Sequence, residues 1–95
     1  MSREEIIDKI RVFFADKPIS KAYLFGSYAR NEQTQESDVD ILVDFEKQAN
    51  LFDLIRLQQN LSELLNLKVD LLSSRGVSKF MLPYIEKDKV LVYER

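Results

Sequence analysis

The residues best suited to chemistry are aspartates in segments predicted to be strands. Asp38 and Asp40 stand two positions apart in Asp38–Phe45, and alternate side chains of a strand point to the same face. Their Cα atoms are then roughly 6.5–7 Å apart, so the carboxylates can bind one divalent ion or bracket two. Aspartate is depleted in strands, and like charges on one face repel unless a cation lies between them. A solvated strand edge that alternates polar and apolar residues is the alternative.

A third aspartate, Asp70, stands in the otherwise apolar segment Lys68–Leu72. Burying a carboxylate without a partner is costly, so Asp70 needs a cation or contact with solvent. If its strand lies beside that of the aspartate pair, Asp70 completes a cluster of three carboxylates. A salt bridge to Lys68 or simple solvent exposure is the alternative. Asp44 shares the parity of Asp40 but lies roughly 13 Å further along the strand, too far to share the same ion.

A glycine–serine turn precedes the aspartate pair. Gly26 and Ser27 directly follow the predicted strand Lys21–Phe25. Glycine lets the backbone approach a ligand closely, and a helix that begins here directs free N–H groups at an anion. Ser27 adds a hydroxyl, and Arg30, one turn later, can meet phosphate oxygens or fix the loop. An ordinary turn between a strand and a helix is the alternative.

The composition narrows the possible chemistry. The chain has no cysteine and no histidine, which excludes disulfides, thiolate metal sites, Ser–His triads and His-ligated zinc. Any bound metal must sit on oxygen ligands, which favours Mg²⁺. The net charge of −2 argues against sequence-independent binding to nucleic acid. No signal-peptide pattern and no apolar run of roughly 20 residues are visible, so we expect a cytoplasmic protein that does not enter a membrane.

Helices and strands are predicted to alternate along a single domain, residues 1–95. Helices are expected at Arg3–Ala15 after a Ser2/Glu5 capping box, at Leu51–Leu65 after Asn50, and from Ser78 through Glu86. Strands are expected at Lys21–Phe25, Asp38–Phe45, Lys68–Leu72 and Val90–Tyr93. This alternation predicts an α/β fold, a small mixed four-stranded sheet with helices packed on it. Core packing is expected for Tyr23, Phe25, Phe45 and Phe52. It is also favoured over a partner surface for Phe80, Met81, Tyr84 and Tyr93.

Taken together, these parts indicate phosphoryl-group chemistry. Carboxylates hold Mg²⁺, the metal bridges triphosphate oxygens, and the Gly-Ser turn binds the distal phosphates. In a two-metal site, one ion activates the attacking oxygen and the other stabilises the leaving pyrophosphate. Such a mechanism requires no histidine.

The order and spacing of these motifs resemble a known signature. Gly26-Ser27-Tyr28-Ala29-Arg30 followed by Ser37-Asp38-Val39-Asp40 is similar to the Gly-Ser-x-x-Arg…Ser-Asp-x-Asp pattern of the DNA polymerase beta-like nucleotidyltransferase superfamily. The size and the Lys68–Leu71 strand resemble its minimal nucleotidyltransferase (MNT) branch, over nearly the whole chain. The resemblance implies that the catalytic, metal-binding carboxylates are Asp38, Asp40 and Asp70. It implies that Gly26 and Ser27 contact the triphosphate, and Arg30 and Ser37 are further candidate nucleotide-binding residues.

The resemblance also implies a partner. Similar minimal proteins are antitoxins, which form a complex with a HEPN-domain ribonuclease toxin and transfer AMP from ATP onto a tyrosine near its active site. A chain of 95 residues has no room for accessory acceptor-binding domains, so the partner or a homo- or hetero-oligomer must supply the acceptor site. Two alternatives stay open: a non-catalytic module that sequesters its partner, and nucleotidyl transfer to a small molecule such as an aminoglycoside antibiotic.

Overall fold

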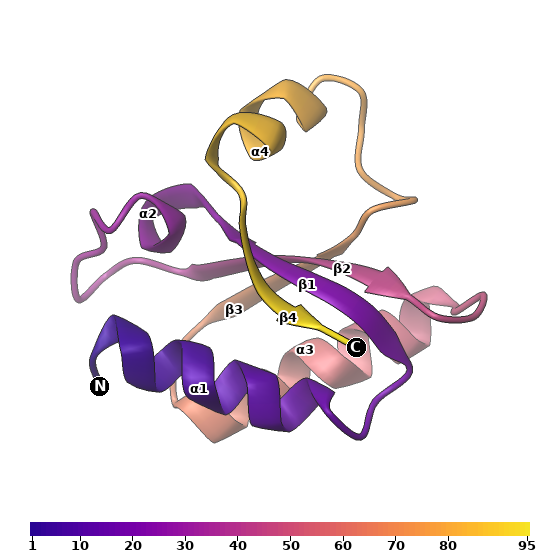
Figure 1. Ribbon diagram of the computed structural model, residues 1–95, viewed down its shortest axis with the longest axis horizontal. Helices are drawn as coiled ribbons and strands as arrows, with labels where there is room; N and C mark the ends of the chain where they lie inside the picture. Colours follow the sequence, from indigo (N-terminus) through magenta and orange to yellow (C-terminus); the bar gives the residue numbers. More distant parts are fainter.

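In the computed structural model, which describes residues 1–95, helices and strands alternate along the chain (Figure 1). The helices are α1 (Arg3–Phe14), α2 (Gly26–Ala29), α3 (Leu51–Leu65) and α4 (Leu82–Asp88). The strands are β1 (Ile19–Phe25), β2 (Val39–Phe45), β3 (Val69–Ser73) and β4 (Val90–Glu94). They form one sheet in the order β3-β2-β1-β4, in which β2 and β3 are parallel and the other neighbours antiparallel. The predicted mixed four-stranded sheet is confirmed.

The ends of the elements follow local hydrogen bonds and burial. β1 begins at Ile19 rather than Lys21, because Ile19 pairs with Phe45 and its side chain is completely buried. Ser78 does not begin α4 directly. Its hydroxyl accepts a hydrogen bond of 3.3 Å from the N–H of Met81 and so closes the turn that precedes the helix. The predicted cap of α3 is confirmed, since Asn50 and Asp53 form a reciprocal capping box.

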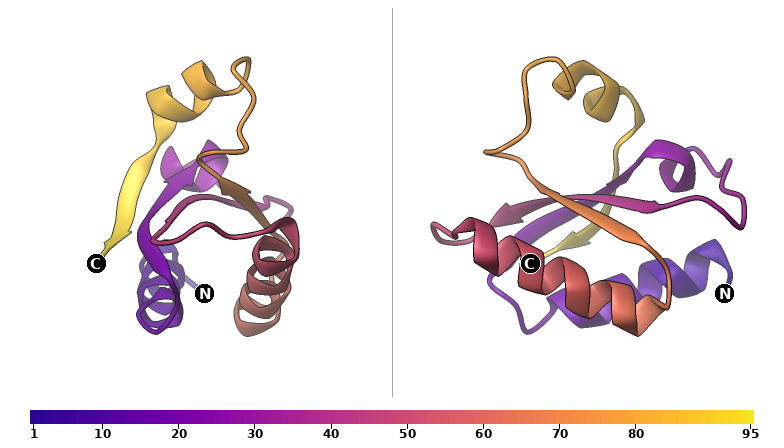
Figure 2. Two further views of the ribbon diagram at one scale, coloured as in Figure 1. Left: turned by 90° about the vertical axis from the view of Figure 1, so that its right-hand side faces the viewer. Right: turned by 180° about the vertical axis from the view of Figure 1, so that it is seen from behind.

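One face of the sheet is covered by α1 and α3, which lie side by side beneath it (Figure 2). Val39, Ile41 and Val43 of β2 point into this layer and are completely buried. A slip of one residue would carry the aspartates of β2 into the core, so the apolar alternation fixes the register. The core cluster consists of Ile6, Ile10, Phe14, Ile19, Ala22, Leu24, Tyr28, Val39, Ile41, Val43, Leu57, Leu61, Leu65, Val69, Leu71 and Val92.

The opposite face of the sheet carries only the short helix α4, held above it between the loop after β3 and the start of β4 (Figure 1). Ile85 is the buried residue of this helix. The prediction that Phe80, Met81 and Tyr84 join the core is wrong, because their side chains are 88%, 45% and 76% exposed. The same prediction is wrong for Phe52 of α3, which is 74% exposed. A helix of this length turns only one side to the sheet, and Ile85 occupies that side.

The edge strand β3 is closed by side chains of α3. In its parallel ladder with β2, the N–H groups of Val69 and Leu71 point outward. They donate to Ser62 Oγ at 3.0 Å and to Gln58 Oε1 at 2.9 Å. An edge strand otherwise presents unpaired backbone groups to other chains, so α3 blocks this side of the sheet. None of the helices combines the length and the apolar character that a bilayer crossing requires.

Replacing Gln58 by Ala is expected to lower the free energy of unfolding by about 1–2 kcal/mol, because the partly buried N–H of Leu71 loses its acceptor. Gln59→Ala, at an exposed position of the same helix, is the control and should change it by less than about 0.5 kcal/mol. Urea unfolding followed by circular dichroism measures both variants. Equal loss of stability in the two variants would show that the edge contact contributes nothing.

Candidate active site

Two of the predicted aspartates lie side by side in neighbouring strands. Asp40 of β2 and Asp70 of β3 are Cα partners in the parallel ladder. The preceding pair, Val39 and Val69, is buried in the core under the sheet. Because side chains alternate along a strand, both carboxylates leave the sheet on the other face, where α4 lies. The structure therefore brings together Asp40 and Asp70, which are far apart in the sequence.

Asp38 stands just before β2 at the same end of the sheet. Its Oδ2 lies 3.5 Å from the Nζ of Lys68, the residue before β3. Lys68 thus pairs with Asp38 and not with Asp70, whose side chain is exposed. The Lys68 side chain is itself 78% exposed, so the ion pair contributes little to stability and Asp38 stays accessible to a ligand.

The glycine turn touches the carboxylates directly. Phe25, the last residue of β1, is the Cα partner of Asp40, so Gly26 comes next to the Asp40 side chain. Gly26 has φ of +70°, a conformation that residues with a Cβ rarely adopt. A Cβ at this position would also overlap Asp40 Oδ2. Glycine therefore suits this position through its backbone conformation, and any larger residue would also displace the Asp40 carboxylate.

The helix after this turn is anchored from below. Tyr28 of α2 is 5% exposed and belongs to the core cluster, and its carbonyl accepts a hydrogen bond of 2.7 Å from Arg3 Nε. Ser27, half-buried, precedes it in the first turn. The first N–H groups of a helix have no partner within it, so the backbone around Ser27 keeps donors for an anion. The turn and the carboxylates thus form one continuous surface.

The grouping of carboxylates changes the acidity of Asp40. Burial, then the nearby charges of Asp70 and Asp38, raise the pKa of Asp40 from 3.8 to about 6, against the opposite effect of Lys68 and Arg30. Negative charge is therefore concentrated where a cation would be stabilised. In this chain alone, no three acidic side chains converge closely enough to enclose an ion by themselves. The donors still fit Mg²⁺, a hard cation that usually takes one or two carboxylates and completes its shell with substrate phosphates and water.

Arg30 and Ser37 are engaged in contacts within the protein. The Nη1 of Arg30 donates to Asp88 Oδ2 of α4 at 2.6 Å, and its Nε lies 3.4 Å from Glu32 Oε2. The Ser37 hydroxyl accepts from the N–H of Thr34 at 2.9 Å and closes the loop before β2. These contacts hold α2 against α4 and shape the loop. A direct contact of either residue with nucleotide stays a prediction.

Sequence reasoning missed Asp88. It stands in a charged stretch at the end of α4 that is typical of a solvated helix end. Its side chain is only 19% exposed, because Arg30 covers it from α2. The two residues are 58 positions apart, and no local pattern links them. Only the way in which α4 lies over the sheet could have identified this pair.

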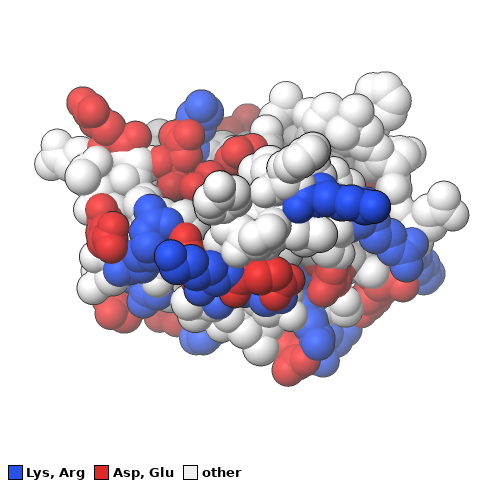
Figure 3. All heavy atoms as spheres, turned by 90° about the horizontal axis from the view of Figure 1, so that it is seen from above, with Lys and Arg blue, Asp and Glu red and all other residues white.

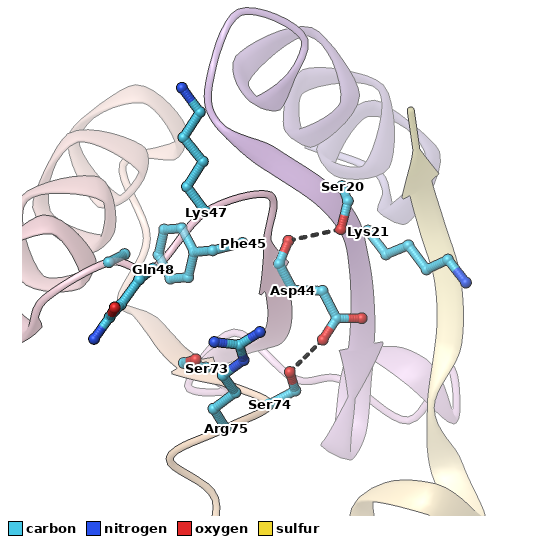
Figure 4. Close-up of a pocket in the computed structure, with 10 residues that line it drawn as sticks. Ser20, Lys21, Asp44, Phe45, Lys47, Gln48, Ser73, Ser74 and Arg75 are labelled. Atoms are coloured by element: carbon cyan, nitrogen blue, oxygen red, sulfur yellow. Dashed lines mark hydrogen bonds between the residues drawn. The ribbon is translucent and has the colours of Figure 1, made fainter.

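The polar residues at the far end of the sheet form a separate pocket of about 520 Å³ (Figure 4). Asp44 lies here and accepts a hydrogen bond from Ser74, as Figure 4 shows, so its separation from the other aspartates is confirmed. None of the five main pockets on the surface is lined by Asp38, Asp40 or Asp70. The carboxylates therefore lie on an open surface and not in a closed cavity.

Replacing Gly26 by Ala is expected to lower the free energy of unfolding by about 2 kcal/mol or more, from the positive φ and the overlap with Asp40 together. Gly76→Ala is the matched control. Its φ is not in the left-handed range and its Cβ would meet only Ser73 O at 3.8 Å, an ordinary contact. Thermal unfolding measures both. If the two substitutions had equal effects, the close approach at Gly26 would not constrain the fold.

Replacing Asp40 by Asn is expected to stabilise the metal-free protein at pH 8 and to change little at pH 4. Because the pKa of Asp40 is higher in the folded state, its charge weakens folding as the pH rises from about 4 through about 6. Partial exposure reduces the gain at pH 8 to about 1 kcal/mol. Urea unfolding at both pH values measures the change in the free energy of unfolding. Glu36→Gln, at an exposed position, is the control for loss of charge. A gain that is independent of pH would contradict this explanation.

Comparison with known proteins identifies the family. The family model described as polymerase beta nucleotidyltransferase matches residues 8–95. A candidate protein adenylyltransferase of Methanocaldococcus jannaschii is 40% identical over 93 residues, which cover 95% of this chain and 92% of that protein. Protein adenylyltransferase MntA of Thermococcus cleftensis is 41% identical over 69 residues, which cover 73% of this chain and 70% of MntA.

Solved structures with a similar fold come from toxin–antitoxin complexes. A crystal structure of a toxin–antitoxin with AMP-PNP matches with a TM-score of 0.83 and 26% identity, over 94% of this chain and 73% of that chain. A complex of an MNT antitoxin with a tri-AMPylated Shewanella oneidensis HEPN toxin matches in fold, with a TM-score of 0.80 and 23% identity. The match covers 99% of this chain and 74% of that chain. The chain therefore belongs to the polymerase beta nucleotidyltransferase family, and within it to the group of small protein adenylyltransferases.

Proposed function

We propose that the chain transfers AMP from Mg²⁺–ATP onto a tyrosine of a HEPN-domain toxin and thereby acts as its antitoxin. The observation that carries the proposal is the contact of the Gly26 turn with Asp40, beside Asp70, on one open face. The chain's membership of the polymerase beta nucleotidyltransferase family supports the same activity, as do its relatives, which are described as protein adenylyltransferases. The similarity to chains from toxin–antitoxin complexes supports the antitoxin role.

Asp38, Asp40 and Asp70 would hold Mg²⁺, which supplies charge neutralisation to the triphosphate and to the leaving pyrophosphate. The backbone of Gly26 and the hydroxyl of Ser27 would bind the distal phosphates. In the transfer, the acceptor hydroxyl oxygen forms a bond to the α-phosphorus. The bond from that phosphorus to the bridging oxygen of the β-phosphate breaks, and pyrophosphate leaves. Asp70, the most exposed of the three carboxylates, is placed to take the hydroxyl proton.

The open surface around the carboxylates favours a protein as the acceptor. A small-molecule acceptor is usually held in a concave pocket that covers most of its surface. None of the five main pockets is lined by Asp38, Asp40 or Asp70. An acceptor on a folded partner needs no such pocket, because the partner's own surface positions it. A partner protein is therefore favoured over an aminoglycoside as the acceptor.

Label transfer tests the proposal. The chain is incubated with Mg²⁺, the HEPN protein encoded beside it and ATP labelled on the α-phosphate, with γ-labelled ATP as control. We expect label on the HEPN protein from α-labelled ATP only, and its loss when a phenylalanine replaces the acceptor tyrosine. Chelation of Mg²⁺ should abolish the transfer.

The double substitution Asp38→Asn with Asp40→Asn is expected to reduce the transfer rate by at least about 100-fold, because carboxylate charges that act on the transition state are removed. Asp44→Asn, at the far end of β2, is the matched control and should retain activity close to that of the original chain. Full transfer by the double variant would exclude this site. A stable complex without any transfer by the original chain would instead favour a sequestering antitoxin.

A further inference from the structure

We propose that the exposed apolar side chains of Phe80, Met81 and Tyr84, called here the α4 surface, dock the protein that carries the acceptor. The complementary patch of that protein is apolar and is edged by acidic side chains. The inference rests on the proposed function for the identity of this partner, a HEPN-domain protein. The location and chemistry of the surface follow from the structure.

The α4 surface is not required by the fold. Phe80 lies in the turn that leads into α4 and Tyr84 in the first turn of the helix; they are 88% and 76% exposed, and Met81 between them is 45% exposed. The helix is held to the sheet through Ile85, which is 1% exposed, and through the pair of Asp88 with Arg30. Aromatic side chains and methionine are enriched at protein interfaces, where burying them is favourable at low cost in conformational entropy. Their exposure here is therefore explained by a partner better than by packing.

The position of α4 connects this surface to the candidate active site. The helix lies on the same side of the sheet as Asp40 and Asp70 (Figures 1 and 2). Its C-terminal end is joined to α2 by the 2.6 Å contact of Arg30 with Asp88. Lys89, the next residue, lies 4.6 Å above the ring of Tyr23 in β1. A protein docked on α4 would thus border the carboxylates that must receive its hydroxyl.

The charge around the α4 surface selects an acidic rim on the partner. Arg75, Lys79 and Lys87 are exposed, and none of them has a carboxylate within 4 Å. Lys79 directly precedes Phe80 and Lys87 follows Tyr84 by three residues, although the chain as a whole carries a net charge of −2, whereas Arg75 lines the separate pocket at the far end of the sheet. Figure 3, which looks down on this side of the molecule, shows a broad uncharged area with basic side chains next to it. Complementary charge would guide and orient the encounter.

A second exposed apolar patch provides an internal comparison. Leu51, Phe52 and Ile55 of α3 are 66%, 74% and 39% exposed. They belong to the helix layer on the other side of the sheet, away from α4 (Figure 2). A partner docked on α3 would be separated from Asp40 and Asp70 by the sheet itself. Of these two patches, the α4 surface is the one on the side of the carboxylates.

The test compares two double variants of matched chemistry in the full chain. Phe80→Asp with Tyr84→Asp alters the α4 surface, and Leu51→Asp with Phe52→Asp alters the α3 patch. Calorimetric titration with the HEPN protein encoded beside the chain is expected to show at least tenfold weaker binding for the α4 variant, the size of an interface hot spot. The α3 variant should bind within about twofold of the original chain, as energetically neutral positions do. Both should bind Mg²⁺–ATP unchanged, which confirms that they are folded.

A third variant tests the charge. Lys79→Glu with Lys87→Glu should weaken binding at low salt and reduce its dependence on salt concentration. Unchanged affinity of the α4 variant, equal losses in both apolar variants, or no binding by the original chain would overturn the proposal. If the α4 variant is misfolded, Phe80→Ser with Tyr84→Ser replaces it under the same criteria. Binding without AMP transfer by the original chain would refute the proposed activity while the affinities still decide the docking surface.

Discussion

The arrangement of the candidate site depends on the close approach of the Gly26 backbone to the carboxylate of Asp40. β1 and β2 pair up to the position where Phe25 faces Asp40, so the chain must turn away directly over that side chain. The turn has a positive φ and leaves no space for a Cβ. Because Tyr28 is then fixed in the core, the direction of α2 follows from the same turn. The contact therefore sets where the backbone proposed to bind phosphate lies relative to the carboxylates.

A fold that places like charges next to each other must offset their repulsion by favourable packing elsewhere. Asp40 and Asp70 are direct neighbours across two parallel strands, and burial, followed by the charge of Asp70, raises the pKa of Asp40. The opposite side of the same strands is completely apolar, with Val39, Ile41 and Val69 in the core. Burial of such side chains contributes roughly 1.5–3 kcal/mol each, which offsets the cost of the acidic face. The candidate site and the hydrophobic core thus use opposite sides of the same strands.

Much of this arrangement could be predicted from the sequence, but its long-range parts could not. The alternation of Val39, Ile41 and Val43 predicted β2 and the side on which its aspartates lie, because a strand repeats every two residues. The pairing of Asp40 with Asp70 requires the strand order, which no local pattern contains. The contact of Arg30 with Asp88 depends on the path of α4. The exposure of Phe80 and Tyr84 was predicted wrongly, because hydrophobicity alone does not say which side of a short helix finds a neighbour.

The closure of β3 by Gln58 and Ser62 has a consequence for the rigidity of Asp70. A strand at the edge of a sheet ordinarily opens more readily than its interior neighbours, because its outer backbone groups exchange freely with water. Here fraying of β3 also breaks bonds to α3, a fifteen-residue helix whose other side is anchored in the core. Strand and helix therefore form one cooperative unit. This unit holds Asp70 in place, so in the proposed function an exposed carboxylate at the margin of the sheet would need little reorganisation on substrate binding.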